Sequence, residues 1–379
     1  MLHGTRVVEL AIWVAGPAAG GLLADWGADV IKVEPPTGDP MRRMFGSIGV
    51  ERDAVPPYDL DNRGKRCVQL DLTNEAGRQT FDALLATADV FITNLRIDAL
   101  ARLGLEPTAV RAKHPRLIYS LVTGYGMVGP ERDRAGYDVG AFWARSSLAH
   151  STVPPGQLPP ALRSGAGDHA TGATLAAGIL AALYNREKTG EGRLVHTSLL
   201  RTGIYMNGWD ISIRQHFGRI ASTKPRTTMN APLLNCYATA DGRAFWLLGL
   251  ESDRHWPGLV RAIDKPEIAD DPRFATAGTR LQASEALIAF LDEVFLSQPY
   301  AHWVSQFDAE DVWFAPINSI ADVLEDPQAI ASGAFIDVPT DTATMNRSVA
   351  SPVDFSDFEL RPGPVRALGA DTEEVLSSL

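Results

Sequence analysis

The chain has 379 residues, a formal net charge of -11 at pH 7, and 45% hydrophobic against 21% charged residues. This length suits about two domains, and the composition excludes a disordered chain. Nonspecific binding to nucleic acid or to an acidic membrane surface requires a strongly positive field, so the negative charge argues against both kinds of partner. An anionic ligand would have to meet a local basic cluster.

Targeting signals and metal-ligand patterns are not found in the sequence. The N-terminus enters an apolar segment without the charged start and cleavage site of a signal peptide, and no apolar run reaches the roughly 20 residues of a membrane span. Cys67 and Cys236 lie far apart and match no metal-ligand spacing. We therefore expect a cytoplasmic protein with reduced cysteines, no metal and no membrane partner.

Short apolar runs alternate with helical stretches over the first 125 residues. Because strands separated by helices of this length form a parallel sheet with right-handed crossovers, the pattern predicts an α/β architecture. Ligands of such sheets bind beyond the carboxyl ends of the strands. The expected strands are 7–10, 30–33, 67–70, 90–93 and 117–122, and the expected helices are 17–26, 75–87 and 98–113.

A second type of pattern begins after residue 221. The runs 234–239 and 244–248 flank Ala240-Asp241-Gly242-Arg243, which is a hairpin signal, and helices rich in Trp, Leu and Ala follow. We expect a small α+β domain over 222–312. The large domain is expected over 1–205 and 313–379, with a linker over 206–221.

A glycine motif after the fifth expected strand invites a wrong interpretation. The segment from Gly124 to Gly129 matches G-x-G-x-x-G, which is typical of dinucleotide binding. That motif requires its last glycine to enter a helix, whereas a polar turn beginning at Pro130 follows here. Nicotinamide or flavin binding is therefore disfavoured.

Basic residues at strand ends and one aspartate at a helix start are candidate site residues. Together such cations predict a local anion site, although any single one of them is more often a solvated surface charge. Asp168 opens a helix of about twenty residues, where it is either a helix N-cap or a catalytic carboxylate. The basic candidates are Arg42, Arg43, Arg63, Lys65, Arg66, Arg96 and Arg102.

Ordered motifs along almost the whole chain resemble the class III CoA transferases, the family of formyl-CoA transferase, carnitine-CoA transferase and α-methylacyl-CoA racemase. The motifs stand in the family's order, which makes them more specific than any one of them alone. They include Ala15-Gly16-Pro17, the run 22–40, Asn62-Arg63-Gly64-Lys65-Arg66, Asn94-Leu95-Arg96, Gly136-Tyr137-Asp138, Gly167-Asp168-His169-Ala170-Thr171-Gly172 and Ala315-Pro316-Ile317-Asn318-Ser319.

The resemblance implies a fold and a ligand. It implies a Rossmann-like large domain built from both chain ends, a small domain between them, and two subunits interlocked as a homodimer. It implies CoA or acyl-CoA as substrate, a free carboxylic acid as co-substrate, and no tightly bound cofactor. The positions that match the family's CoA-binding residues are Val14, Ala15, Lys65, Asn94, Leu95, Arg96 and Arg102. Formyl-CoA transferase has a glutamine at the position of Val14, which argues against formyl-CoA as substrate.

The resemblance also implies a mechanism in which Asp168 carries the acyl group as an anhydride and then CoA as a thioester. We expect the N-terminus of its helix to favour the ionised nucleophile. Racemases of the family use a histidine where this chain has Tyr137, and a phenol is a weak base at neutral pH. Transferase activity is therefore favoured over the alternatives, an acyl-CoA racemase or epimerase and a noncatalytic CoA-binding paralogue. Tyr137, Asp138 and Trp143 are candidates for lining the acyl pocket.

Overall fold

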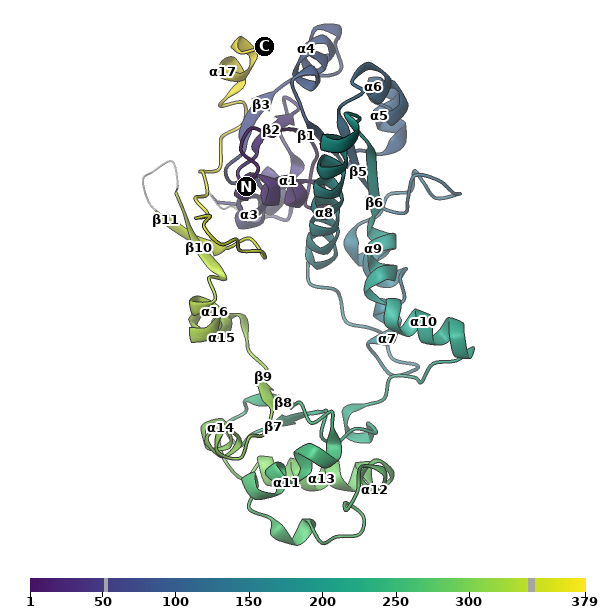
Figure 1. Cartoon of the computed structure of the whole chain (residues 1–379), viewed down its shortest axis with the longest axis vertical. Coiled ribbons are helices and arrows are strands. Elements are labelled where there is room, and N and C mark those ends of the chain that lie inside the picture. Colours follow the sequence, from purple (N-terminus) through teal and green to yellow (C-terminus); the bar gives the residue numbers. More distant parts are fainter. Residues whose placement is uncertain (51–53, 340–344) are drawn as a thin grey trace. The chain divides into compact units, whose positions relative to one another are not determined.

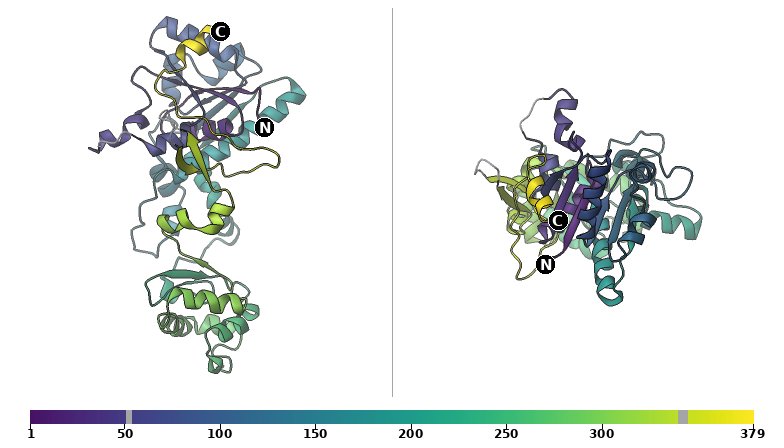
Figure 2. Two further views of the ribbon diagram at one scale, coloured as in Figure 1. Left: turned by 90° about the vertical axis from the view of Figure 1, so that its left-hand side faces the viewer. Right: turned by 90° about the horizontal axis from the view of Figure 1, so that it is seen from above.

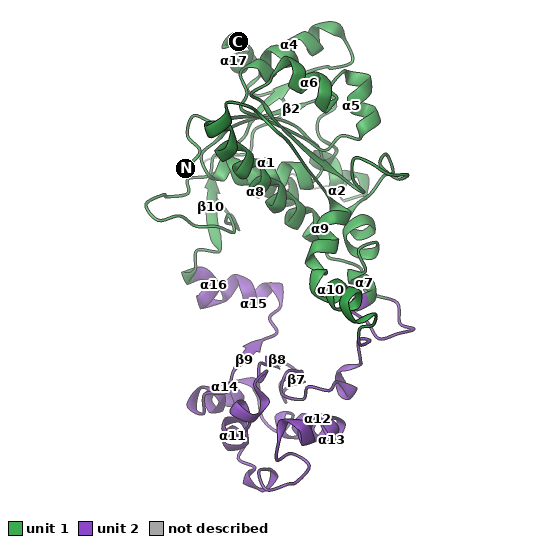
Figure 3. Ribbon diagram, turned by 45° about the vertical axis from the view of Figure 1, so that its right-hand side comes forward, with its two compact units in different colours: residues 1–150, 159–220, 331–379 green, residues 151–158, 221–330 purple. Residues whose placement is uncertain are grey.

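The computed structural model describes residues 1–50, 54–339 and 345–379. Contacts within the chain define two compact units: unit 1 comprises residues 1–150, 159–220 and 331–379, and unit 2 comprises residues 151–158 and 221–330 (Figure 3). The segment expected to be a linker, 206–221, lies in unit 1 up to residue 220. Residues 313–330, expected in the large domain, lie in unit 2, because β9 (Phe314–Pro316) pairs with β8 (Ala244–Leu247).

Unit 1 is built on a parallel sheet of six strands in the order β3-β2-β1-β4-β5-β6 (Figure 1). The first five are the strands expected from the sequence, and the α/β prediction is confirmed. The sixth was not foreseen, because its polar His196, Thr197 and Ser198 hide the apolar pattern. The strands are β1 (Arg6–Leu10), β2 (Asp29–Glu34), β3 (Arg66–Gln69), β4 (Val90–Thr93), β5 (Ile118–Thr123) and β6 (Leu194–Ser198).

Helices cover both faces of this sheet (Figure 2). The single helix expected over 98–113 is two helices, because Gly104 ends the first with a φ of 70° and Pro107 starts the second. One face is covered by α1 (Ala15–Asp25) and α8 (Ala166–Thr189), and the other by α4 (Glu75–Ala86), α5 (Ile97–Leu103) and α6 (Pro107–Lys113). The remaining elements before unit 2 are η1 (Pro40–Arg43), α2 (Met44–Ser47), α3 (Pro56–Asn62), the π-helical η2 (Asp138–Ala144), α7 (Leu148–Ser151), α9 (Leu199–Met206) and α10 (Gly208–Phe217).

The small residues of α8 allow it to lie directly against α1. A Cβ atom on Gly172 would come within 2.8 Å of the Ala18 side chain and 2.9 Å of the Ala15 carbonyl oxygen. Any larger residue would push the two helices apart. This close packing brings the start of α8, with Asp168, next to the start of α1.

Unit 2 contains the antiparallel hairpin that the sequence predicts. β7 (Cys236–Ala238) pairs with β8, which also pairs with β9. Aromatic rings form much of the core, with Phe295 in edge contact with Tyr237, Phe245 and Trp303. The helices are η3 (Arg226–Thr228), α11 (Ser252–Ala262), η4 (Pro266–Ile268), α12 (Ala277–Gln282), α13 (Ser284–Phe295), α14 (Tyr300–Ala309), α15 (Ile320–Glu325) and α16 (Pro327–Ala331).

The C-terminal segment belongs to unit 1. It contains the hairpin of β10 (Phe335–Pro339) and β11 (Met345–Val349) and ends with α17 (Thr372–Ser377) beside β3. The Asp371 carboxylate accepts a hydrogen bond of 2.8 Å from the backbone N–H of Cys67. Among the described residues, no helix combines the length and apolar character that a membrane crossing needs.

Candidate functional site

A cavity of about 370 Å³ lies in unit 1 beyond the carboxyl ends of β1, β4 and β5. This is where the parallel sheet was expected to bind its ligand. The loop after each of these strands contributes to the wall, and the first turn of α8 completes it. The lining residues are Ile12, Trp13, Val14, Ala15, Asn94, Leu95, Arg96, Ala99, Val122, Thr123, Gly124, Arg132, Arg134, Ala135, Gly136, Tyr137, Asp168 and Leu199.

The loop between β1 and α1 is held firmly in this wall. The side chain of Asn94 accepts a hydrogen bond from the Ile12 N–H at 3.0 Å and donates one to the Ile12 carbonyl oxygen at 2.6 Å. α1 then starts at Ala15, directly after the cavity residue Val14. Asn94, Val14 and Ala15, three of the residues matched to CoA binding, are thus brought together.

Asp168 is the carboxylate in the wall of this cavity. It is the third residue of α8, and Gly165 rather than Asp168 is the N-cap, so the N-cap alternative is excluded. Burial, followed by the negative charges of Asp138 and Asp61, raises the pKa of Asp168 to about 7, while the neighbouring His169 acts in the opposite direction. This upward shift is opposite in direction to the expected effect of the helix N-terminus, because desolvation and two like charges raise the pKa.

Asp138 supports the site from beside the cavity. It is buried at the start of the π-helical turn η2, where its carboxylate accepts hydrogen bonds from the N–H of Gly165 at 3.0 Å and of Val139 at 2.7 Å. The first of these bonds fixes the residue that caps α8. Asp138 therefore positions the helix of Asp168 and places a negative charge near it.

The two aromatic candidates for the acyl pocket lie in different places. Tyr137 lines the cavity and is 63% exposed, with its ring 6.2 Å from that of Trp13. Trp143 does not line the cavity: it packs against Phe142 and Leu199 and donates a hydrogen bond from its indole N–H to the Pro160 carbonyl oxygen.

Most of the basic cluster expected from the sequence is engaged in ion pairs. Lys65 is 2% exposed, and its Nζ atom contacts Glu9 Oε2 at 2.7 Å, the Pro17 carbonyl oxygen and Asn62. These partners come from other segments of the chain, which is why the sequence alone overestimates the anion site. The other paired residues are Arg42 with Glu34, Arg63 with Asp25, and Arg66 with Asp29.

Three arginines do line the cavity. Arg96, predicted from the sequence, is exposed at the N-cap of α5. Arg132 and Arg134 were treated only as part of a polar turn, but the turn carries them to the cavity, where they pair with Asp133 and Glu131. Arg102 lies in the last turn of α5 and is not among the lining residues.

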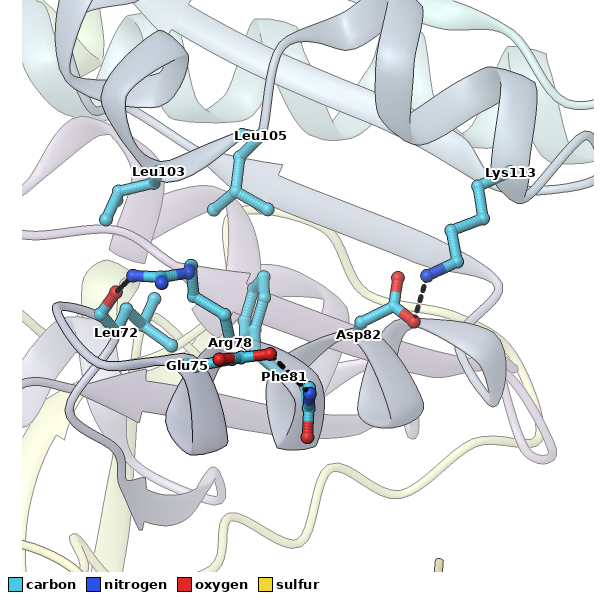
Figure 4. Close-up of a pocket in the computed structure, with 10 residues that line it drawn as sticks. Leu72, Glu75, Arg78, Phe81, Asp82, Leu103, Leu105 and Lys113 are labelled. Carbon is cyan, nitrogen blue, oxygen red and sulfur yellow. Dashed lines mark hydrogen bonds and ion pairs between the residues drawn. The ribbon is translucent and has the colours of Figure 1, made fainter.

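A second cavity of unit 1, about 340 Å³, lies between α4 and the segment joining α5 to α6 (Figure 4). Its two basic side chains already have partners: Arg78 donates to the carbonyl oxygens of Leu72 and Thr73, and Lys113 pairs with Asp82. The cavity at Asp168 also has the exposed Arg96, which makes it the stronger candidate for an anionic ligand.

A third cavity of unit 1 lies on the other side of the start of α8. His169 lines it together with Asp61, whose Oδ1 atom is 3.0 Å from His169 Nε2. The hydrogen bond to Asp61 is the main cause that raises the pKa of His169. His169 thus lies directly beside Asp168 in the chain while facing a different cavity.

Comparison with known proteins identifies a family. The model of CoA-transferase family III matches residues 2–372. The (R)-2-hydroxy-4-methylpentanoate CoA-transferase of Clostridioides difficile is 34% identical over 384 residues, covering all of this chain and 95% of the relative. The succinate–glutarate CoA-transferase of Agrobacterium fabrum is 33% identical and also matches the whole chain and 95% of its own length. A crystal structure of a CaiB/BaiF family protein from Brucella suis has a TM-score of 0.87, 30% identity, and coverage of 99% and 98%.

Proposed function

Because the chain belongs to CoA-transferase family III, we propose that it moves CoA from an acyl-CoA thioester to a free carboxylic acid, with Asp168 as the nucleophile. The observation that carries this proposal is the position of Asp168. Its carboxylate lines the cavity at the carboxyl edge of the sheet, and its pKa of about 7 keeps a substantial fraction ionised at neutral pH. Among the residues that the structure describes, no ion pair engages Asp168, and an unpaired carboxylate can attack a thioester.

The reaction proceeds through four transfers at one carboxyl group. An Asp168 oxygen attacks the donor thioester carbonyl, the C–S bond breaks, and CoA leaves as the thiolate, which gives a mixed anhydride. The thiolate attacks the aspartyl carbonyl and releases the donor acid, which leaves an aspartyl-CoA thioester. The acceptor carboxylate attacks the carbonyl of this thioester, the C–S bond breaks, and a second mixed anhydride forms between Asp168 and the acceptor acid while the thiolate leaves. Attack of the thiolate on the acceptor acyl carbonyl gives the new acyl-CoA and restores Asp168.

We place CoA along the loops after β1 and β4. Val14, Ala15, Asn94, Leu95 and Arg96 line this part of the cavity, and the Arg96 guanidinium is suited to a phosphate. Lys65 would act indirectly in this arrangement, since its ammonium group is bound to Glu9 and to the first turn of α1. Arg102, one to two turns further along α5, would meet only the far end of CoA.

The racemase alternative is less well supported. Proton transfer at the α-carbon requires a second base beside Asp168. The described residues that line the cavity include no histidine, and Tyr137 stands where family racemases have one. Racemase activity would appear as entry of solvent deuterium into the α-position of a 2-methylacyl-CoA.

We also propose that two copies of the chain form a homodimer, interlocked as the family resemblance implies. Large apolar side chains on α9 and α10 support this proposal, because such clustered exposure marks an interaction surface. They include Ile204 at 43%, Tyr205 at 81%, Met206 at 51%, Trp209 at 81% and Phe217 at 70% exposed.

The proposed function is tested by trapping the activated carboxyl group. We expect incubation with an acyl-CoA followed by hydroxylamine to convert Asp168 to a hydroxamate, because hydroxylamine attacks anhydrides and thioesters but not free carboxylates. Peptide mass spectrometry reads the position of the label, and enzyme incubated with free CoA is the control. Turnover of acyl-CoA to a new acyl-CoA without label at Asp168 would contradict the mechanism.

The pH dependence of transfer provides a second test. Since only ionised Asp168 is a nucleophile, kcat/KM should fall tenfold per pH unit below about 7. His169→Gln removes the side chain whose electrostatic interaction lowers the pKa of Asp168, so this limb of the profile should move to higher pH, with activity regained near pH 9. His114→Gln is the matched control, because His114 pairs with Asp82 at 3.1 Å in the same way but away from the cavity. If His169→Gln lowered kcat/KM by the same factor at every pH, His169 would have only a structural role.

A further inference from the structure

A tryptophan in a left-handed backbone conformation forms part of the cavity wall. Trp13 has a φ of 64° and lines the cavity together with Asp168 and Tyr137. Bulky side chains rarely adopt this conformation, and they keep it only where the surrounding structure over-determines it. Such positions gather at functional sites, so the contacts that hold Trp13 are informative.

Buried charged groups hold the backbone of Trp13 in place. Asp39, which is fully buried, accepts hydrogen bonds on Oδ1 from the N–H of Trp13 at 3.2 Å and of Met41 at 2.9 Å. Its Oδ2 atom lies 3.0 Å from Nζ of the buried Lys32. On the other side, Asn94 binds both backbone groups of Ile12. The turn is therefore fixed from both ends.

These contacts direct the indole ring to a defined place. Trp13 packs against the cluster of Val14, Met41 and Tyr58, and it meets Tyr137 edge to face, with ring centroids 6.2 Å apart and an angle of 89°. Edge-to-face pairs are a preferred aromatic arrangement, so the contact helps to hold both rings in the cavity wall. The apolar side chains of Val122 and Leu199 line the same cavity and lie outside the part assigned to CoA.

Burial and, after it, the like charges of Asp138 and Asp61 raise the pKa of Asp168. A further carboxylate placed close to Asp168 would meet the same two charges. An apolar acyl group would instead meet the aromatic and aliphatic side chains of Trp13, Tyr137, Val122 and Leu199, which line the cavity.

We propose that Trp13, held in its left-handed conformation by Asp39, is a specificity-determining residue that selects acyl-CoA donors with a bulky apolar acyl group. This inference rests on the proposed function, because the acyl group must lie beside Asp168 during transfer. It goes further in naming the class of acid and the side chain that chooses it.

The test compares two donors with one acceptor, propanoate. We expect the wild type to prefer 3-phenylpropanoyl-CoA to acetyl-CoA by at least about 10-fold in kcat/KM, the scale of discrimination by a hydrophobic pocket. Asn tolerates positive φ, so Trp13→Asn removes the ring and keeps the backbone. This variant should lose at least about 10-fold with the phenylpropanoyl donor and less than about threefold with acetyl-CoA.

A double-mutant cycle shows whether the two rings act as one surface. If they do, Trp13→Asn and Tyr137→Ala should lose less together than the sum of their separate losses with the phenylpropanoyl donor. If Trp13→Asn lowered kcat/KM equally with both donors, or with neither, the specificity role of Trp13 would be overturned. Labelling of Asp168 from acetyl-CoA alone would overturn the apolar class while the proposed function stands. Absence of labelling from both donors would count against the proposed function itself.

Discussion

Asp168→Asn should abolish CoA transfer, with kcat reduced by at least about 10³-fold, because the amide cannot form the anhydride. Binding of CoA should change little, since the loops after β1 and β4 form the proposed CoA site without Asp168. The measurements are acyl-CoA exchange by mass spectrometry and CoA affinity by calorimetry. Retained exchange would exclude Asp168 as the nucleophile.

The same variant should be more stable than the wild type at alkaline pH. The pKa of Asp168 is raised from its usual 3.8 to about 7, so the folded state disfavours the charge that the unfolded chain carries freely. The cost is absent below pH 4, grows between pH 4 and 7, and is complete above pH 7, where it reaches roughly 4 kcal/mol at most. Asp168→Asn removes this cost, and its melting temperature should exceed that of the wild type at pH 8 but not at pH 4.

Glu285→Gln is the matched control for this stability effect. Glu285 is an exposed acidic residue in the first turn of α13, where a negative charge interacts favourably with the helix dipole. Its removal should lower the free energy of unfolding by about 0.5 kcal/mol, the opposite sign. A stabilisation in both variants would point to general charge reduction rather than to the surroundings of Asp168.

The sheet of unit 1 could be predicted because its strands are continuous apolar runs. Val7, Val8, Val30 and Ile31 are buried from both faces, as parallel strands require, so the run itself is the signal. β6 lacks that signal, with its half-exposed Leu194 and Val195 followed by polar residues. Gly104 and Pro107 are typical of a helix end and a helix start, and they mark the break between α5 and α6. The helical periodicity on both sides of them nevertheless led to the prediction of a single helix.

The sequence could predict site residues only where their place at the end of a helix or strand indicates their role. Asp168 and Arg96 lie at element ends, and both line the cavity. The pairing of Lys65 with Glu9 depends on a contact across 56 residues, which no local pattern contains. The upward shift of the Asp168 pKa depends first on burial and then on Asp138 and Asp61, which come from separate segments. The ion-pair partner of Lys65 and the pKa of Asp168 are therefore set by contacts between distant segments, which the sequence does not reveal.

Lys32→Met should be strongly destabilising, by roughly 3–5 kcal/mol, because it leaves the buried Asp39 carboxylate without its cation and leaves Glu9 with Lys65 alone. Lys32 is 1% exposed, and its Nζ atom contacts Glu9 at 3.0 Å, Asp39 at 3.0 Å and the Ala11 carbonyl oxygen at 2.9 Å. Burial alone would lower the pKa of Lys32, but these carboxylates raise it above its usual value. Lys32 therefore stays charged and paired below pH 10. The decrease in the free energy of unfolding caused by Lys32→Met, measured by chemical unfolding, should be the same at pH 6 and pH 8.

An exposed ion pair offers the matched comparison. Arg361 and Glu359 are 81% and 74% exposed, so Arg361→Met should leave the free energy of unfolding nearly unchanged. An equally small effect of Lys32→Met would show that the buried network contributes little.

A second substitution separates the cost of the unpaired charge from the loss of the lysine. Asp39→Asn keeps an oxygen that accepts the Trp13 N–H while it removes the negative charge that Lys32 balances. Added to Lys32→Met, it should recover part of the lost stability, because a buried amide costs less than a buried unpaired carboxylate. Such a recovery would mean that the left-handed turn of Trp13 requires only a hydrogen-bond acceptor at position 39. It would also mean that Lys32 is required because Asp39 carries a negative charge.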